Sequence, residues 1–449
     1  MQLGLHFFNE LKDDRSKSRH KQEIPVTLSN AESIKPENQT TLGDSFTLKN
    51  GQTIKNRLFK SAMSEQLGTK EHNPQPGLTI LYGRWAKGGI GLSITGNIMV
   101  DRTALGEPKN VVLDEKSDLT EFKRWAEAGK QNGAQIWPQL NHPGKQIPSF
   151  LNDEPVAPSA ISLGRGLEKA FNTPRELTHD EILVIVNKFA TSAKLAKEAG
   201  FTGVQIHGAH GYLVSQFLSS RHNQRNDQWG GSLENRMRFV LSVYKAIREQ
   251  VGEDFPIGIK LNSADFMKGG FTEEESMQVV QALSDAGIDL IEISGGTYES
   301  PSMMGNDPKK KVKESTLKRE AYFLDYMEKV RKLVDTPLVV TGGFRSAPAM
   351  TEALQSGATD FIGIARTTAV DPEFPNKLIA DANYKMHLPD PTTGNKGLDT
   401  MGMISITWYE HQLWRLAKGK NAKPNLSAKG VVFKTVLSAG IYAFKKRRA

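Results

Sequence analysis

The chain has 449 residues, of which 38% are hydrophobic and 24% are charged, and these values are ordinary for a globular protein. It contains no cysteine, which excludes disulfides, thiolate zinc sites and cysteine-bound iron–sulfur clusters. No apolar run approaches the ~20 residues of a membrane-spanning helix, and the N-terminus lacks the pattern of a secretory signal. We therefore expect a cytoplasmic protein with no membrane span.

The formal net charge is +8, and part of it lies in two basic runs, at residues 309–311 and 445–448. A solvated surface is the ordinary interpretation of such an excess. Attraction of an anionic cofactor and loose contact with an anionic membrane surface are two other interpretations. The sequence shows no nucleic-acid-binding motif, so we expect no nucleic-acid partner.

Residues 1–45 are polar and mixed in charge, and only residues 3–11 have the pattern of a short amphipathic helix. From residue 46 onward, short β-rich runs alternate with helical patterns, which is typical of βα units with parallel strands. We predict eight strands, at residues 57–63, 91–98, 134–140, 203–207, 256–261, 289–294, 337–341 and 360–364. Helical patterns lie between them at residues 119–132, 180–199, 233–251, 273–286, 321–334 and 347–355.

Eight strands, each followed by a helix, predict an α/β fold, namely a closed (β/α)8 TIM barrel over residues 46–387. Residues 1–45 and 388–449 would form an N-terminal and a C-terminal extension, the second packing on the barrel. A doubly wound sheet is the alternative, but no Gly-x-Gly-x-x-Gly pattern follows the first strand.

Two segments interrupt the regular alternation. The connection at residues 141–178 is rich in Pro, Gly and Ser, and its length predicts a lid or a small β subdomain. After residue 388 the sequence is polar except for an aromatic cluster at Trp408, Tyr409 and Trp414. The apolar residues 431–444 predict a last helix against the barrel rather than a membrane anchor.

In a TIM barrel the active site lies at the C-terminal ends of the strands. The fourth predicted strand runs into a glycine-bearing turn that carries His207, His210 and Tyr212. Two imidazoles there can point at one small acceptor atom while the phenol approaches from another side. This pattern suits a site that binds an oxygen and delivers a proton beside it. The alternative is a metal site with His142 as third ligand, as in metal-dependent hydrolases on this fold.

The last two predicted strands both end in glycine-bearing turns with an arginine, one carrying Gly343 and Arg345, the other Gly363 and Arg366. Exposed backbone amides at such turns, together with arginine side chains, form a site for phosphate. In TIM barrels a phosphate site commonly follows strands seven and eight. Two solvated turns are the alternative interpretation.

Lys260 ends the fifth strand, where a cation is costly unless it meets an anion or a polar partner. It would stabilise a negatively charged cofactor or form a salt bridge at the barrel rim. Gln139 ends the third strand, where an amide can read a ring with alternating donors and acceptors. Ser64 directly follows the first predicted strand, and Gly96 lies near the end of the second, so both are expected at the same end of the barrel.

The chain resembles the old yellow enzyme family of flavin-dependent ene-reductases, the NADH:flavin oxidoreductases. The resemblance is strongest from Phe201 to Phe239, which includes His-Gly-Ala-His-Gly-Tyr at residues 207–212, and it extends over residues 46–377. The matching segments are residues 55–63, 86–91, 139–145, 155–159, 207–217, 229–236, 258–262, 294–296, 341–345 and 363–366.

The resemblance implies noncovalent FMN at the barrel mouth and NADH or NADPH as the electron donor. No metal is implied. The residues implied to bind FMN are Gly343, Arg345, Gly363 and Arg366 at its phosphate, Gln139 and Lys260 at its pyrimidine edge, and Ser64 and Gly96 near its O4 and N5 edge.

The implied reaction is hydride transfer from NAD(P)H through flavin N5 to the activated C=C bond of an α,β-unsaturated carbonyl or nitro compound. His207 and His210 would hydrogen-bond the substrate oxygen, and Tyr212 would protonate the α-carbon. Gln66 stands where some relatives carry Tyr, which predicts a different pocket polarity. Two rival functions remain: a metal-dependent hydrolase, and a barrel that binds flavin but turns over little substrate. An interface through the aromatic segment of the C-terminal extension would give a homo-oligomer.

Overall fold

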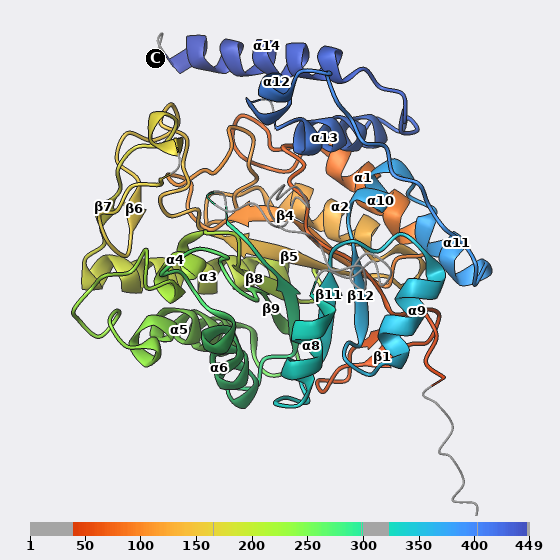
Figure 1. The fold of residues 1–449 in the computed structure, drawn as a ribbon, viewed down its shortest axis with the longest axis horizontal. Coiled ribbons are helices and arrows are strands. Elements are labelled where there is room, and N and C mark those ends of the chain that lie inside the picture. Colours follow the sequence, from red (N-terminus) through yellow and green to blue (C-terminus); the bar gives the residue numbers. More distant parts are fainter. Residues whose placement is uncertain (1–38, 165, 298, 300–322, 402, 447–449) are drawn as a thin grey trace, which may run out of the picture. The chain divides into compact units, whose positions relative to one another are not determined.

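The computed structural model describes residues 39–164, 166–297, 299, 323–401 and 403–446. Within the compact unit Asn38–Ala449, eight parallel strands close into a barrel (Figure 1). Around the barrel the strands are β10 (Leu290–Ser294), β11 (Leu338–Thr341), β12 (Phe361–Ile364), β3 (Leu58–Lys60), β4 (Leu92–Met99), β5 (Gln135–Asn141), β8 (Val204–Gly208) and β9 (Ile257–Asn262). The predicted TIM barrel is confirmed, and the doubly wound sheet is wrong. The helix predicted at residues 3–11 and the basic run at 309–311 lie outside the described residues.

Helices surround the barrel where the sequence has apolar residues at helical spacing. They are α1 (Pro76–Lys87), α2 (Leu119–Gly129), α3 (His179–Glu198), α5 (Leu233–Val251), α6 (Glu273–Asp285), α8 (Leu324–Arg331), α9 (Ala347–Gln355), α10 (Arg366–Val370) and α11 (Phe374–Ala380). Thr178 and Thr272 begin α3 and α6 with capping boxes, in which the threonine and the third helical residue, a glutamate, satisfy each other's backbone N–H groups. These local signals explain why the predicted helices are found at their predicted positions.

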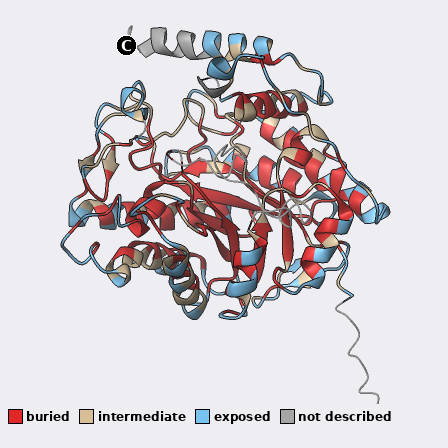
Figure 2. Cartoon of the chain, viewed as in Figure 1, coloured by how far each residue is buried: buried red, intermediate tan, exposed pale blue. Residues whose placement is uncertain are grey.

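The barrel interior is divided along its axis into an apolar and a polar part. Figure 2 shows the barrel strands almost entirely buried. Toward the N-terminal ends of the strands, a buried apolar cluster fills the interior: Leu48, Ile54, Phe59, Leu92, Ile94, Trp137, Leu290, Val339 and Phe361. Gly203 lies so close to the Trp137 ring that a Cβ there would come within 2.4 Å of it. Toward the C-terminal ends the buried interior side chains become polar, so the chemistry is confined to that end.

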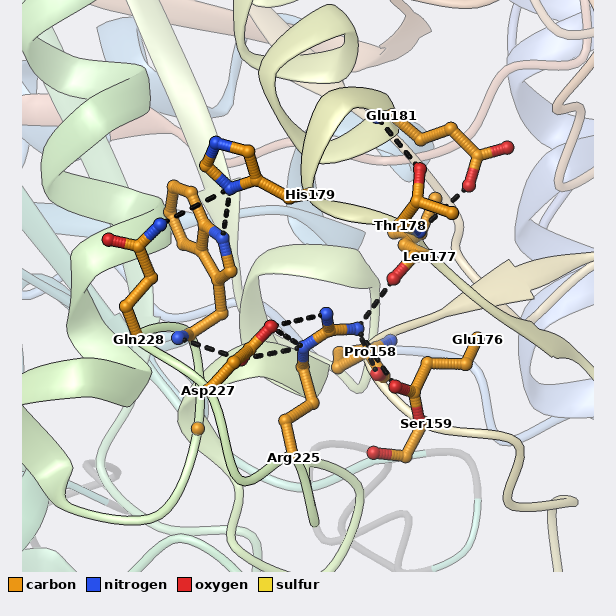
Figure 3. Close-up of polar contacts among 12 residues, drawn as sticks. Pro158, Ser159, Glu176, Leu177, Thr178, His179, Glu181, Arg225, Asp227 and Gln228 are labelled. Atoms are coloured by element: carbon orange, nitrogen blue, oxygen red, sulfur yellow. Dashed lines mark hydrogen bonds and ion pairs between the residues drawn. The ribbon is translucent and has the colours of Figure 1, made fainter.

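The connection between β5 and α3 contains two short paired strands, β6 (Val156–Ala157) and β7 (Arg175–Glu176), in agreement with the predicted small β element. Arg225 holds both ends of this element (Figure 3). Its guanidinium donates to the carbonyl oxygens of Pro158 at 2.9 Å and Leu177 at 2.6 Å. The same group pairs with Asp227 at 2.6 Å. One buried cation therefore connects the segment after α4 (Leu213–Leu218) to the long connection.

After residue 388 the described part of the chain forms α12 (Lys396–Met401), α13 (Ile404–Leu416) and α14 (Ala428–Lys446). The indole N–H of Trp414 on α13 donates to the carbonyl oxygen of Glu65 at 2.8 Å, which ties α13 to the segment after β3. The last predicted helix exists, but it packs on α13, on the side away from the barrel (Figure 1). Among the described helices, none has both the length and the apolar character that crossing a bilayer demands. The boundaries proposed at residues 45/46 and 387/388 stay predictions.

Replacing Arg225 with Ala should lower the free energy of unfolding by about 2–4 kcal/mol, because two buried carbonyl groups and a carboxylate lose their partner. Urea unfolding monitored by tryptophan fluorescence measures this loss. Arg124→Ala is the matched control, since the Arg124 side chain is 66% exposed and pairs with Glu121 within one helix turn. We expect the control to change stability by less than about 0.5 kcal/mol. Equal losses in the two variants would contradict the anchoring role of Arg225.

Candidate active site

The turn after β8 places three candidate side chains within a short stretch of backbone. His210 and Gly211 both adopt positive φ angles, of 63° and 79°. Such a conformation is strained for a non-glycine residue and is often found at functional sites. Gly208 has no room for a side chain, since a Cβ would lie 3.0 Å from the carbonyl oxygen of Lys260. Tyr212 then caps α4, so the chain reverses sharply at the barrel mouth.

The predicted catalytic side chains are brought together by this turn. The ring centroids of His207 and His210 are 5.2 Å apart, and those of His207 and Tyr212 are 4.8 Å apart. Nδ1 of His207 accepts the backbone N–H of Ala209 at 3.3 Å, which leaves the proton of a neutral ring on Nε2. Nε2 of His210 lies 2.9 Å from Oγ of Ser294. Each ring is therefore held by one partner on one nitrogen.

Both histidines are kept neutral by their surroundings. Burial lowers the pKa of His207 well below its ordinary value, and the neighbouring His210 and the charge of Lys260 lower it further. Burial and the charge of Lys260 lower the pKa of His210 in the same way. A neutral imidazole carries one N–H donor, and that donor can hydrogen-bond an oxygen without a full positive charge.

Lys260 is positioned by the strand register. On β9 it lies beside His207 of β8 on one side and Glu292 of β10 on the other. Its Nζ is 3.1 Å from Oε1 of Glu292, and both side chains are almost fully buried. The expected cation is thus present at the barrel mouth, and its anionic partner is a residue that the sequence analysis did not single out.

Glu292 is the centre of a hydrogen-bonded layer across the barrel. It accepts from Gln205 at 2.8 Å and from Thr341 at 2.8 Å. Gln205 in turn accepts from Nε2 of Gln139 at 2.7 Å. Gln139 and Lys260, predicted at the same ligand edge, therefore belong to one connected layer. Glu292 shows the same signal as Lys260, a charged residue inside an apolar strand.

The phosphate prediction falls on two turns that lie side by side, because β11 and β12 are neighbours. Gly343 has a φ of 98°, a conformation that favours glycine. A Cβ on Gly363 would lie 1.9 Å from Oγ1 of Thr341, so no side chain fits there. Arg345 and Arg366 are close enough to Tyr409 of α13 for both charges to lower its pKa against the larger raising effect of burial. The guanidinium carbon of Arg366 lies 5.8 Å from the centre of the Tyr409 ring, and Arg345 lies within electrostatic range of the same tyrosine.

Ser64 and Gly96 line the same small cavity. Oγ of Ser64 donates a short hydrogen bond to Oε2 of Glu107. The backbone N–H of Gly96 donates to Oε1 of Glu65 at 3.0 Å, and a Cβ on Gly96 would collide with that carboxylate. Both predicted residues are therefore together, and each contacts a glutamate that the sequence analysis did not single out.

A chain of half-buried polar groups connects Ser64 to the buried Glu410 of α13. Nε2 of Gln66 donates to Glu410 at 3.1 Å and lies 3.5 Å from Glu107. Burial and, after it, the nearby Glu107 raise the pKa of Glu410 to about 8. Burial also raises the pKa of Glu107. The polarity expected from Gln66 is present, and α13 supplies its second partner.

The donor set fits FMN. Gln139 and Lys260 offer an amide and a cation in one layer, which suits a ring edge with alternating donors and acceptors. The turns at Gly343 and Gly363 let the backbone come close to a ligand, and Arg345 and Arg366 add positive charge there. This combination suits a phosphate. His142, the third ligand of the metal alternative, instead lies 4.0 Å from Asp101. Within the described ranges, no group of three or more His, Cys, Asp or Glu side chains is arranged to hold a metal ion.

Comparisons with known proteins agree with this geometry. A family model described as NADH:flavin oxidoreductase / NADH oxidase matches residues 42–384. The NADH-dependent flavin oxidoreductase iliE of Hypocrea jecorina is 39% identical, over 76% of this chain and 89% of its own length. The relative iccE of Talaromyces variabilis, with the same description, is 38% identical, over 84% of this chain and 98% of its own length. The structure of an old yellow enzyme homologue from Zymomonas mobilis is 25% identical, with a TM-score of 0.64, over 77% of this chain and 94% of that chain.

The raised pKa of Glu410 predicts a pH dependence of stability. Because the folded-state pKa of about 8 exceeds the ordinary value of 4.5, the folded state holds this proton more tightly. The resulting stabilisation is present below pH 4.5 and is lost as the pH rises to about 8. Glu410→Gln cannot ionise, so its unfolding free energy should fall less over this interval, by about 1–3 kcal/mol. Urea unfolding at several pH values measures the difference. The exposed Glu115→Gln is the control, and identical pH curves for Glu410→Gln and the unsubstituted protein would refute the assignment.

Proposed function

This chain belongs to the NADH:flavin oxidoreductase / NADH oxidase family, and we propose that within it the protein is an ene-reductase. It is an oxidoreductase that uses FMN with NADH or NADPH as its electron donor. The proposed substrates are α,β-unsaturated carbonyl or nitro compounds, whose activated C=C bond is reduced. The observation that carries this proposal is the pair of buried, neutral imidazoles beside Tyr212 and Lys260.

The proposed FMN-binding residues are those that the site geometry brings to the barrel mouth. FMN, when bound, accepts hydride from the nicotinamide and passes it to the substrate. Lys260 would offset negative charge at the pyrimidine edge, and Gln139 would hydrogen-bond the same edge. The phosphate would lie on the turns of Gly343, Arg345, Gly363 and Arg366, while Ser64 and Gly96 would face the ring.

The two histidines are proposed to bind the substrate oxygen. His207 presents Nε2–H, since its Nδ1 is occupied by the Ala209 amide. If Ser294 donates to Nε2 of His210, the neutral ring carries its proton on Nδ1. Two fixed N–H groups then face an oxygen that gains negative charge as the C=C bond is reduced. Donors that are positioned before the reaction stabilise such charge without reorganisation.

Tyr212 is proposed to supply the proton. Its ring lies 4.8 Å from that of His207, centroid to centroid, so it faces the same small volume as the imidazoles. A phenol with an ordinary pKa near 10 can protonate a carbon of enolate character. The predicted cytoplasmic location and the predicted homo-oligomer are further parts of this proposal.

The visible spectrum of the purified protein tests the proposal directly. We expect yellow absorption that bleaches on anaerobic addition of NADPH or NADH and returns on addition of 2-cyclohexenone. Comparing the two bleaching rates ranks the electron donors. Bound flavin that bleaches but is not reoxidised by enones or nitroalkenes would instead favour a flavin-binding barrel with little turnover. A colourless protein that cannot be reconstituted with FMN would overturn the assignment.

Replacing His207 and His210 together with Ala should slow reoxidation by the enone about 10²–10³-fold, because two donors to the substrate oxygen are lost. Stopped-flow absorbance separates this step from flavin reduction by NAD(P)H. His387→Ala, at an exposed site, is the control. Unchanged enone affinity and rate in the double variant would disprove the oxygen-binding role.

Tyr212→Phe keeps the ring and removes only the hydroxyl group. It should slow reoxidation by the enone about 10²-fold or more, because the proposed proton donor is absent. The same stopped-flow experiment measures this rate, and flavin reduction by NAD(P)H serves as the internal control. A normal rate in this variant would mean that another donor, such as water, supplies the proton.

A further inference from the structure

The helix α14 exposes apolar side chains. Phe433, Val436 and Leu437 are 65%, 64% and 49% exposed, and their spacing of three and four residues places them on one face of the helix. Five of the twelve large hydrophobic side chains that are exposed in the described ranges lie between residues 398 and 437: Leu398, Met403, Phe433, Val436 and Leu437. Exposed residues on α14 are visible in Figure 2. A cluster of this kind marks an interaction surface more often than scattered single residues do.

The opposite face of α14 is already packed. Val431 and Ala428 are buried, and Oγ1 of Thr435 lies 3.4 Å from Nε2 of His411 on α13. The helix is therefore held on the body by one face while its apolar residues point elsewhere. In the sequence, Ile441 and Phe444 follow Leu437 at helical spacing.

The charge of this part of the chain is one-sided. Residues 411–449 contain ten Lys and Arg and no Asp or Glu, which leaves 48 basic and 50 acidic residues in positions 1–410. The whole positive excess of the protein thus lies in this segment. Five of these lysines are exposed, namely Lys418, Lys420, Lys423, Lys429 and Lys434. An anionic surface is the natural complement of such a segment.

We propose that α14 docks on the surface of an anionic lipid bilayer. Phe433, Val436 and Leu437 would enter the boundary between headgroups and acyl chains, and the lysines would face the anionic headgroups. Exposed aromatic and aliphatic side chains with lysines among and beside them, as on α14, can bind an anionic bilayer surface in this way without crossing it. The rest of the protein would remain in water, held at the membrane by this helix.

A second copy of the chain is a poorer partner for the same face. In a twofold-symmetric dimer, identical surfaces meet, so two segments of the same strong positive charge would be brought together. Like charges placed opposite one another disfavour that association, whereas anionic lipid removes the repulsion. The combination of exposed apolar residues with an unbalanced positive charge therefore favours lipid over self-association.

Cosedimentation of the full chain with vesicles tests the proposal. The protein should pellet with vesicles of phosphatidylcholine mixed with phosphatidylglycerol, remain in solution with phosphatidylcholine alone, and be released as salt is raised. Phe433→Ser combined with Leu437→Ser should weaken binding about tenfold or more, since two apolar side chains that would enter the bilayer are lost. Lys429→Glu combined with Lys434→Glu should weaken it similarly while leaving Phe433, Val436 and Leu437 unchanged.

Leu183→Ser combined with Val184→Ser, on the exposed face of α3, is the matched control and should bind vesicles like the unsubstituted chain. FMN content and NAD(P)H oxidation should be unchanged in all variants. The proposal is overturned if the full chain stays in solution with anionic vesicles at low salt, or if the α14 variants bind them as well as the control does. It is also overturned if those variants instead dissociate a dimer seen by light scattering, because the face would then belong to a second copy.

Discussion

The buried pair of Lys260 and Glu292 is the interaction on which the site depends. Taking two charges out of water costs several kcal/mol per ion, and their attraction offsets this only when the remaining hydrogen-bonding positions are filled. Here Gln205 and Thr341 fill them on the glutamate side. The pair is not symmetric in its effect, because Lys260 is the charge that lowers the pKa of both His207 and His210. Burial is the main cause of the neutral histidines and Lys260 adds to it, while the ion pair sets the polarity of the barrel mouth.

Strand register turns this pair into a site. His207, Lys260 and Glu292 lie at one level on β8, β9 and β10, and a shift of one residue in any of these strands would turn its side chain from the interior toward the helices. Below this level the interior is apolar, with Trp137 packed against glycine. The apolar cluster therefore does more than stabilise the barrel: it keeps the polar layer at the end of the strands where the turns supply glycines and arginines.

The sequence predicted the barrel well because its strands are apolar runs separated by helical patterns, and both are local signals. Lys260 was found since a cation in an apolar strand demands an explanation, and Glu292 carries the same signal but was not recognised. Glu107 and Glu410 could not be predicted in this way. They come from segments about 300 residues apart and meet only through Gln66, so no local pattern reveals them. The turn at His210 was predicted from its glycines, whereas its positive φ was not.

The electrostatic character of the site follows from these contacts. At neutral pH the two histidines are neutral, and the pKa of about 8 keeps Glu410 protonated. Lys260 is balanced by Glu292, and the buried Lys60 interacts with Glu65. Arg345 and Arg366 supply positive charge near Tyr409, where Asp390 also acts. A phosphate placed there is attracted by this charge, while the region of the histidines, being neutral and buried, strengthens hydrogen bonds to an oxygen that becomes negative. The same barrel mouth thus offers one region for a permanent anion and another for a transient one, and α13 contributes Tyr409 beside Arg366 and Glu410 beside Gln66.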